Sequence, residues 1–406
     1  RAWSLALGML EDPRTPELGG GAEGAAAELW AAPATPGTPS TPSMTASTRR
    51  RQRSCDQLLA GARVDRAALA ELTWKGVPPG QSRGVVWQIL LGHRPELCAE
   101  CDGVVRRRRQ EYFDLRARLH GGSAAVARRR ADQDPGRGGL GGEDLLLRQI
   151  CKDLPRAAAR FEDGASAAAA ERVVKSPQVQ LLMERVLFVW AVQKSTDAYV
   201  QGIDGILLMF LLVFLSDRDG VDPERLDVGV LERLGSQLEE VEADAYWCMS
   251  KVMSLMHDHH NDGFPGIQRM TAALRQLVWR IDERLARHLE SEGIDLLESG
   301  VRWIGCLMVR ELPVAACARL WDALIAEYAQ VPEDQGSQCF EELLLYFCVC
   351  FLTRHSLDLL KMDFEAIMMF LKRAPSNAVS EDSVDLLLGE AYVLKSLFQG
   401  APGHLR

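Results

Sequence analysis

Long hydrophobic runs are scarce in this chain of 406 residues. Its two unbroken apolar stretches, Ile206–Leu215 and Leu343–Leu352, are each ten residues long, whereas a membrane-spanning helix needs roughly 20 apolar residues. We therefore predict that both stretches are buried core helices and that the chain has no transmembrane segment.

Three other signals are also missing. The sequence lacks G-x-x-x-x-G-K-[ST], the loop that cradles nucleotide phosphates, so the chain is not itself a P-loop GTPase. Alternating runs of β-branched residues, which are typical of strands, are nearly absent. No segment repeats at a fixed period. These absences favour an all-α fold without internal repeats.

An excess of positive charge is missing as well. Lys and Arg number 47 against 56 Asp and Glu, and the net charge of −9 disfavours binding to nucleic acid. The ten cysteines follow no repeated spacing, so we expect reduced thiols and a cytoplasmic location. With 47% hydrophobic and 25% charged residues, the composition is typical of a globular protein with one large domain or two modest ones.

The chain divides into a tail and a helical domain. Residues 1–53 are rich in Pro, Thr and Ser and end in a basic run, so we predict a disordered tail. Apolar residues recur at helical spacing over residues 54–400, with Asp65 as a helix cap. The glycine-rich stretch 121–142 interrupts this pattern and predicts a surface insertion. The predicted fold class is all-α: one large helical domain, in one or two lobes, behind a disordered N-terminal tail.

Two short polar patches, residues 149–156 and 199–202, carry the candidate functional residues. In the first patch Asp153 can cap a helix start, and Pro155 fits a first helical turn, from which Arg156 would project beside the Asp153 carboxylate. The planar fork of an arginine can bridge two phosphate oxygens. An ordinary ion pair at a helix start is the structural alternative.

In the second patch Gln201 lies just before the apolar run at Ile206, and Gly202 lets the backbone approach a partner closely. An amide can donate to and accept from a water molecule at the same time, which suits the positioning of a nucleophile. An exposed polar residue at a helix start is the alternative, and we expect Tyr199 to be a packing ring. An arginine and a glutamine are the two side chains that a GTPase active site borrows or carries.

Five motifs in order resemble the TBC domain, the GTPase-activating module for Rab proteins. They cover roughly residues 72–399 and read Arg83-Gly84-Val85-Val86-Trp87, Ile150-x-x-Asp153-x-x-Arg156, Tyr199-Val200-Gln201-Gly202, Glu242 to Met249, and Trp303 to Asp322. We expect three of their aromatic residues to anchor the core: Trp87, Trp303 and Trp321.

The resemblance implies that Arg156 is an arginine finger and Gln201 a glutamine finger, both supplied in trans to a GTP-bound Rab protein to accelerate GTP hydrolysis. The residues implied to support them are Ile150, Asp153, Pro155, Tyr199 and Gly202. GTP and Mg²⁺ would belong to the Rab protein, so no cofactor and no independent enzymatic site are expected in this chain. The activity would regulate vesicle trafficking at the Golgi or other endomembranes, with peripheral membrane association through the partner or the basic tail.

Two positions depart from the pattern of that family. Ala157 stands where the family usually has Thr, and Asp204 stands where it usually has Asn. A carboxylate near bound GTP would repel its phosphates unless it is paired. These differences leave a second interpretation open, a TBC-like scaffold that binds a GTPase without accelerating it. Arg83 and Asp204 are candidate Rab-facing residues, and Arg83 could instead form an ion pair at the edge of the core.

Two further patterns suggest other chemistry. His257-Asp258-His259-His260 offers metal ligands, but on a helix only His257 and His260 would share a face, so we predict a polar helix end and no metal site. Cys98-Ala99-Glu100-Cys101 is a lone CxxC without a surrounding βαβ pattern, which disfavours a thiol oxidoreductase.

Overall fold

The computed structural model describes residues 45–133, 142–157, 171–194, 199–221, 223, 226–261, 263–372 and 380–399. Within these ranges the regular elements are helices, and the one β pairing is an isolated bridge between Arg63 and Leu97. The predicted all-α fold class is therefore confirmed.

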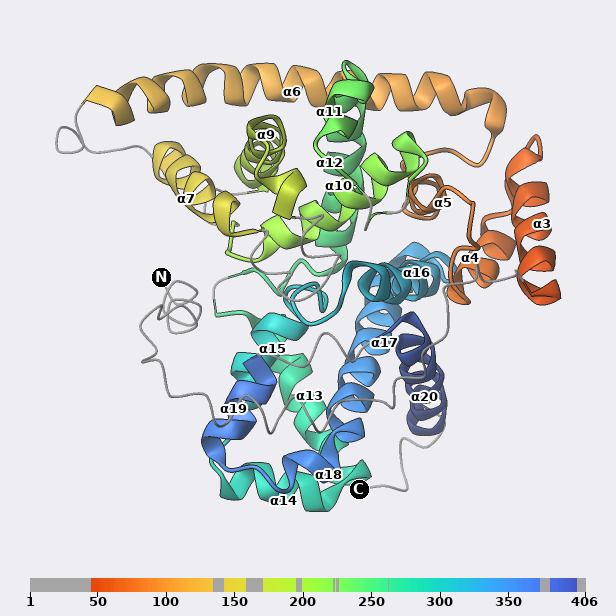
Figure 1. Ribbon diagram of the computed structural model, residues 1–406, viewed down its shortest axis with the longest axis vertical. Helices are drawn as coiled ribbons and strands as arrows, with labels where there is room; N and C mark the ends of the chain where they lie inside the picture. Colours follow the sequence, from red (N-terminus) through yellow and green to blue (C-terminus); the bar gives the residue numbers. More distant parts are fainter. Residues whose placement is uncertain are drawn as a thin grey trace, which may run out of the picture.

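Figure 1 shows the helices in two groups, one above the other, with α16 (Val314–Ala329) between them. The upper group contains α5 (Arg83–Leu90), α6 (Cys98–Gln133), α7 (Gly142–Ala157), α9 (Pro177–Lys194), α10 (Ile203–Asp219), α11 (Gly229–Leu234) and α12 (Gln237–Leu255). The lower group contains α13 (Pro265–Ile281), α14 (Glu283–Ser291), α15 (Leu296–Trp303), α17 (Glu333–Arg354), α18 (Ser356–Leu359), α19 (Phe364–Lys372) and α20 (Glu381–Gln399). At one side lie α3 (Ala46–Ala60) and α4 (Arg66–Trp74).

The two apolar runs are core helices, as predicted. In α10 every residue from Ile203 to Ser216 is buried, and the helix packs against α5, α7, α9 and α12. Among the described residues, α17 is the one helix with the length and composition to cross a membrane, but 61% of its apolar window is buried. It packs on α13, α16 and α20. The burial of α17 against three neighbouring helices accounts for its apolar composition.

Aromatic rings join the upper group of helices to α16 and pack helices of the lower group together. Trp87 of α5, Phe210 of α10 and Trp321 of α16 form a triangle, with ring centroids 5.3–5.8 Å apart. Trp303 contacts Phe351 edge to face at 5.4 Å. All three tryptophans expected to be core anchors are almost fully buried. Edge-to-face and tilted contacts of this kind add to the stabilisation that burial alone supplies.

Two predicted boundaries were wrong. Residues 46–53 of the predicted tail are helical, because Thr45 caps α3 by accepting from the Thr48 amide and Arg51 donates to the Lys75 carbonyl. The glycine-rich stretch does not end α6, which continues to Gln133, and the alanines and arginines that follow the glycines favour that continuation. Residues 1–44 and 134–141 lie outside the described residues. The predicted cap was right, since Asp65 accepts from the Ala68 amide.

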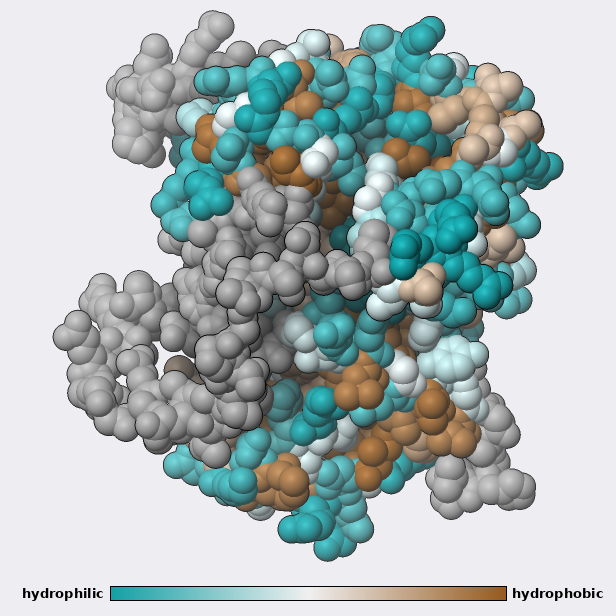
Figure 2. Space-filling model, turned by 45° about the vertical axis from the view of Figure 1, so that its right-hand side comes forward, coloured by the Kyte–Doolittle hydropathy of each residue, from teal (hydrophilic) through white to brown (hydrophobic). Residues whose placement is uncertain are grey.

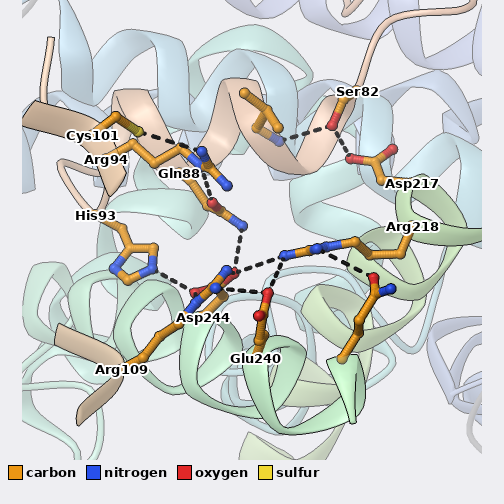
Figure 3. A network of polar contacts seen from close by, with 12 residues as sticks. Ser82, Gln88, His93, Arg94, Cys101, Arg109, Asp217, Arg218, Glu240 and Asp244 are labelled. Carbon is orange, nitrogen blue, oxygen red and sulfur yellow. Dashed lines mark hydrogen bonds and ion pairs between the residues drawn. The ribbon is translucent and has the colours of Figure 1, made fainter. Parts of the chain in front are cut away.

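A buried carboxylate, Asp244 of α12, organises one polar network (Figure 3). It accepts two hydrogen bonds from Arg109, at 2.8 and 2.7 Å, and lies 2.9 Å from Nε2 of His93. Glu240 pairs with Arg109 and Arg218 beside it. Burial alone would raise the pKa of Asp244, but the hydrogen bonds from Arg109 and His93 lower it to about 2.

Two further carboxylates, both fully buried, connect segments that are distant in sequence. Glu242 of α12 accepts from Tyr112 at 2.6 Å and from Arg116 and Arg185, so α6 and α9 are both fastened to α12. Asp322 of α16 accepts from the Trp87 indole at 2.8 Å, and its other partners are the Val77 amide and Arg83. Of the two roles considered for Arg83, a Rab-facing residue or an ion pair at the edge of the core, the structure shows the ion pair.

The surface differs between the two groups of helices. On the face in Figure 2, hydrophilic side chains cover most of the upper part, and hydrophobic ones gather in the lower part. Exposed large apolar side chains are frequent on α20, where they include Leu386, Tyr392, Val393 and Leu397.

The Asp244 network makes a prediction about acid stability. Asp244→Asn should lower the free energy of unfolding by about 3 kcal/mol at neutral pH, because Arg109 loses its buried counter-charge. The folded-state pKa of Asp244 is depressed, so this stabilisation is present above the unfolded-state pKa and is lost as the pH falls through about 2. Urea unfolding of both proteins should show the difference shrinking as the pH falls below about 4.

Asp358→Asn is the control, since Asp358 pairs only with Lys361 on the surface, and both side chains are at least 42% exposed. Its effect should stay below about 1 kcal/mol. Equal effects of the two substitutions at neutral pH would show that the Asp244 network contributes no more than a surface pair.

Candidate functional site

The first polar patch lies at the end of a helix and not at its start. Helix α7 begins at Gly142, with Glu143 and Asp144 in its first turn, so Asp153, Pro155 and Arg156 occupy its last two turns. The sequence prediction failed because Asp153 and Pro155 were taken as signals of a helix start, whereas α7 already begins at Gly142. Pro155 lacks the amide that would continue the hydrogen-bond ladder, and α7 ends two residues later at Ala157.

Asp153 is a buried link between the two patches. Its side chain accepts hydrogen bonds from Nε2 of Gln149 at 3.0 Å and from the Tyr199 hydroxyl at 3.3 Å. Asp153 is 1% exposed and Tyr199 is 8% exposed, so water cannot easily compete for this contact. The bond holds the end of α7 beside the turn that precedes α10, which brings the two sequence patches together as predicted.

Gln201 lies half-buried in the turn between Tyr199 and α10. The ring of Tyr199 packs in the core, so its expected role as a packing ring fits the structure, with the hydroxyl adding the bond to Asp153. Ile150, one turn before Asp153, is fully buried, whereas Pro155 is exposed. The backbone of Arg156 is described, but its side chain lies outside the described part of the structure.

Gly202 shapes this turn. Its φ of +120° is a conformation that side chains with a Cβ rarely adopt, and a Cβ there would lie 2.6 Å from Sγ of Cys306. The close approach that was expected toward a partner is therefore made to Cys306 of the same chain. Cys306 follows α15 and is separated from Gly202 by about a hundred residues, so no sequence signal pointed to it.

Asp204 turns inward and does not face a partner, so its prediction as a Rab-facing residue was wrong. It is fully buried, and Oδ1 accepts from the Gly202 amide at 2.9 Å. An asparagine at this position could accept the same bond through its side-chain oxygen. A carboxylate in the first turn of α10 is also favoured by the helix dipole. Ala157, the other departure, is buried as well.

Two other sequence patterns, the CxxC pair and the run of histidines, lie away from the two polar patches in sequence. Cys98 and Cys101 are both free thiols, and they contact the Gly61 carbonyl and Arg94 respectively. The run of histidines does not lie on a helix, because α12 ends at Leu255 and a turn follows. His257 is exposed and His260 is buried, so the prediction of a shared helical face was wrong.

The tight turn at Gly202 makes a second prediction. Gly202→Ala should destabilise the protein more than Gly220→Ala, which lies at the other end of α10. Gly220 also has a positive φ, +69°, but a Cβ there meets nothing within 4 Å. The Gly220 substitution should therefore cost only the backbone strain, about 1 kcal/mol. Urea unfolding measures both; equal losses would mean that Cys306 yields to the added methyl group.

Known proteins resemble this chain in sequence. The profile of the Rab-GTPase-TBC domain matches residues 80–360. The chain is 35% identical over 344 residues to "GTPase-activating protein gyp1" of Schizosaccharomyces pombe, which covers 84% of this chain and 60% of the relative. It is 32% identical over 351 residues to human "TBC1 domain family member 22B", covering 86% of this chain and 62% of the relative. The chain thus spans about 60% of the length of the curated relatives it matches.

A solved structure has the same fold. The crystal structure of the Ypt/Rab-GAP domain of Gyp1p superposes with a TM-score of 0.70 at 27% sequence identity, covering 86% of this chain and 99% of the other. Residues 80–360, which match the family profile, include both polar patches and three of the buried carboxylates, Asp244, Glu242 and Asp322. This chain belongs to the Rab-GTPase-TBC domain family.

Proposed function

We propose that this chain accelerates GTP hydrolysis by a Rab-family GTPase, with Arg156 and Gln201 reaching into the partner's nucleotide site. The observation that supports this most strongly is the buried bond between Asp153 and Tyr199. It joins two segments, because Arg156 is three residues after Asp153 and Gln201 is two residues after Tyr199. Two side chains that must act on one phosphate need such a fixed relation.

Arg156 would neutralise charge that develops on the γ-phosphoryl group during transfer. A guanidinium can bridge two phosphate oxygens, and it acts more strongly once the partner's surface has excluded water. Its place after Pro155, at the end of α7, puts it on a segment that the buried Asp153 anchors. The anchor limits the motion that a finger on a free loop would have.

Gln201 would orient the attacking water. Its amide oxygen can accept a hydrogen bond from the water, and its NH₂ group can donate one to a phosphate oxygen. The turn that holds it is fixed on both sides, by Tyr199 before it and by the packing of Gly202 against Cys306 after it. Small GTPases commonly carry a glutamine for this task, so the proposal assigns the task to this chain in place of the partner's residue.

The inward orientation of Asp204 favours an activator over an inactive scaffold. The concern was repulsion between a carboxylate and the phosphates of GTP. Because Asp204 is fully buried and bonds the Gly202 amide, it serves the turn that carries Gln201. GTP and Mg²⁺ would come with the Rab protein in its GTP-bound state, so this chain needs no cofactor of its own. Its site of action would be the membrane where that partner resides, within vesicle traffic.

Arginine substitutions test the first finger. Arg156→Ala should reduce stimulation of single-turnover GTP hydrolysis by about 10³-fold or more. Arg156→Lys should recover little, because an ammonium lacks the planar fork. Lys152→Ala is the matched control, since Lys152 is an exposed cation one turn earlier on α7, and stimulation should be retained. A fully active Arg156→Ala protein on the best Rab substrate would remove the arginine finger from the proposal.

Exchange of glutamines between the partners tests the second finger. Gln201→Ala should abolish stimulation while changing the affinity for the GTP-bound Rab only slightly, since one amide contributes little to a large interface. A Rab whose own switch glutamine is replaced by leucine should still respond to the intact chain. Calorimetry of binding and a single-turnover assay give the two readouts. If Gln201→Ala still stimulates hydrolysis and the Rab without its glutamine no longer responds, the Rab residue orients the water. Normal binding of the intact proteins without any stimulation would favour a scaffold that binds a GTPase without accelerating it.

A further inference from the structure

A cluster of metal-ligating side chains lies at the end of α12, away from the two finger segments in sequence. Asp258 and His259 lie in the turn at residues 256–261, which follows α12 and precedes α13 (Pro265–Ile281). Glu341 reaches the same place from α17. One potential ligand atom from each residue lies within 4.8 Å of the other two. Because the segment is a turn, two adjacent residues can point to one spot, which a helix would not allow.

Ligand atoms of Asp258 and His259 are buried and lack hydrogen-bond partners among the described residues. His259 is 0% exposed, and neither of its ring nitrogens has a hydrogen-bond partner. Oδ1 of Asp258 is also buried without one. Leaving such atoms unpaired costs free energy, and each unpaired group in a native structure requires an explanation.

The geometry at His259 suits a shared cation better than a hydrogen bond. Oε1 of Glu341 lies 3.1 Å from Nε2 of His259, yet the two atoms form no hydrogen bond. Oδ1 of Asp258 is 3.9 Å from the same nitrogen. Ligands at about 2.0–2.1 Å around a tetrahedral Zn²⁺ lie roughly 3.3 Å from one another, and the two observed separations bracket that value.

Neighbouring groups hold the cluster in this orientation. Arg269 of α13 pairs with the outer oxygens of both carboxylates, Oδ2 of Asp258 and Oε2 of Glu341. That leaves the inner oxygens of both facing His259. Gly266 packs against the ring so closely that a Cβ there would lie 2.1 Å from Cδ2 of His259. Such outer partners fix the orientation of metal ligands in known sites.

We propose that Asp258, His259 and Glu341 bind one divalent cation of the zinc class, with a fourth position open to water. The donor set of one imidazole nitrogen and two carboxylate oxygens suits Zn²⁺, whereas Ca²⁺ takes six to eight oxygen ligands. The two carboxylates and Arg269 carry a net charge of −1, which a divalent cation compensates. The proposal thus departs from the expectation from sequence, which was a polar helix end without a metal site.

The cation would clamp the turn between α12 and α13 to α17. His260, next in the same turn, is buried with Nε2 3.3 Å from the Gly305 carbonyl. Cys306 follows and lies against Gly202. The clamp would therefore stabilise the segment around Cys306, which supports the turn of Gln201. The metal would have a structural role and take no part in GTP hydrolysis.

Metal binding and thermal stability test the site together. Zn²⁺ is titrated by calorimetry into the chain after alkylation of its exposed thiols, which include Cys98 and Cys151. We expect one ion per chain and a higher melting temperature with Zn²⁺ than with a chelator. Glu341→Gln and His259→Ala should weaken binding by more than about 10-fold and abolish the rise in melting temperature. His257→Ala, which removes an exposed histidine from the same turn, should change neither.

Co²⁺ in place of Zn²⁺ distinguishes this site from a remaining thiol site. A four-coordinate site of nitrogen and oxygen gives visible Co²⁺ absorption without thiolate charge-transfer bands, and Glu341→Gln should remove it. Circular dichroism without metal checks that Glu341→Gln, a same-sized change at a side chain 15% exposed, still folds. No binding by the intact chain, or equal binding by the intact chain, Glu341→Gln and His259→Ala, would overturn the proposal and leave His259 beside the two carboxylates without a metal ion.

Discussion

A buried carboxylate must find its partners inside the protein, and this constraint shapes the whole structure. Each of the five sequence motifs contributes to such a contact. Asp153 joins α7 to the segment before α10, and Asp204 closes the turn at the start of α10. Glu242 and Asp244 fasten α6 to α12, and Asp322 holds the start of α5 to α16. Removing one partner of a buried charge costs several kcal/mol, so these contacts fix the relative positions of the helices they join.

The candidate site depends on the same constraint. The two proposed finger residues lie next to these contacts: Arg156 is in the last turn of α7, and Gln201 is half-buried in the turn before α10. Their positions are set by neighbours that are buried, above all Asp153 and Tyr199. A site held by buried neighbours can leave its functional side chains free to meet a partner while their backbones stay in place.

The sequence was sufficient where the signal was local. The apolar run beginning at Ile206 predicted a buried helix, and Asp65 predicted a helix cap, because hydrophobic pattern and capping act within a few residues. It failed where a helix boundary depended on tertiary packing. Asp153 and Pro155 were taken as signals of a helix start, so the end of α7 was mistaken for a start. The direction of Asp204 also depended on a backbone turn that Gly202 and Cys306 set jointly.

The order of the five motifs identified the family, and the roles proposed for Arg156 and Gln201 come from that resemblance. Long-range contacts such as Glu341 with His259 leave no trace in spacing, because the two residues meet only after α12, α13 and α17 have packed. The central claim is that one bound GTPase receives both fingers at once. A structure of the chain with a Rab protein, GDP, Mg²⁺ and aluminium fluoride tests it most directly. We expect the Arg156 guanidinium on the fluoride and the Gln201 amide on the attacking water; a Rab glutamine on that water, with Gln201 turned away, would contradict the account.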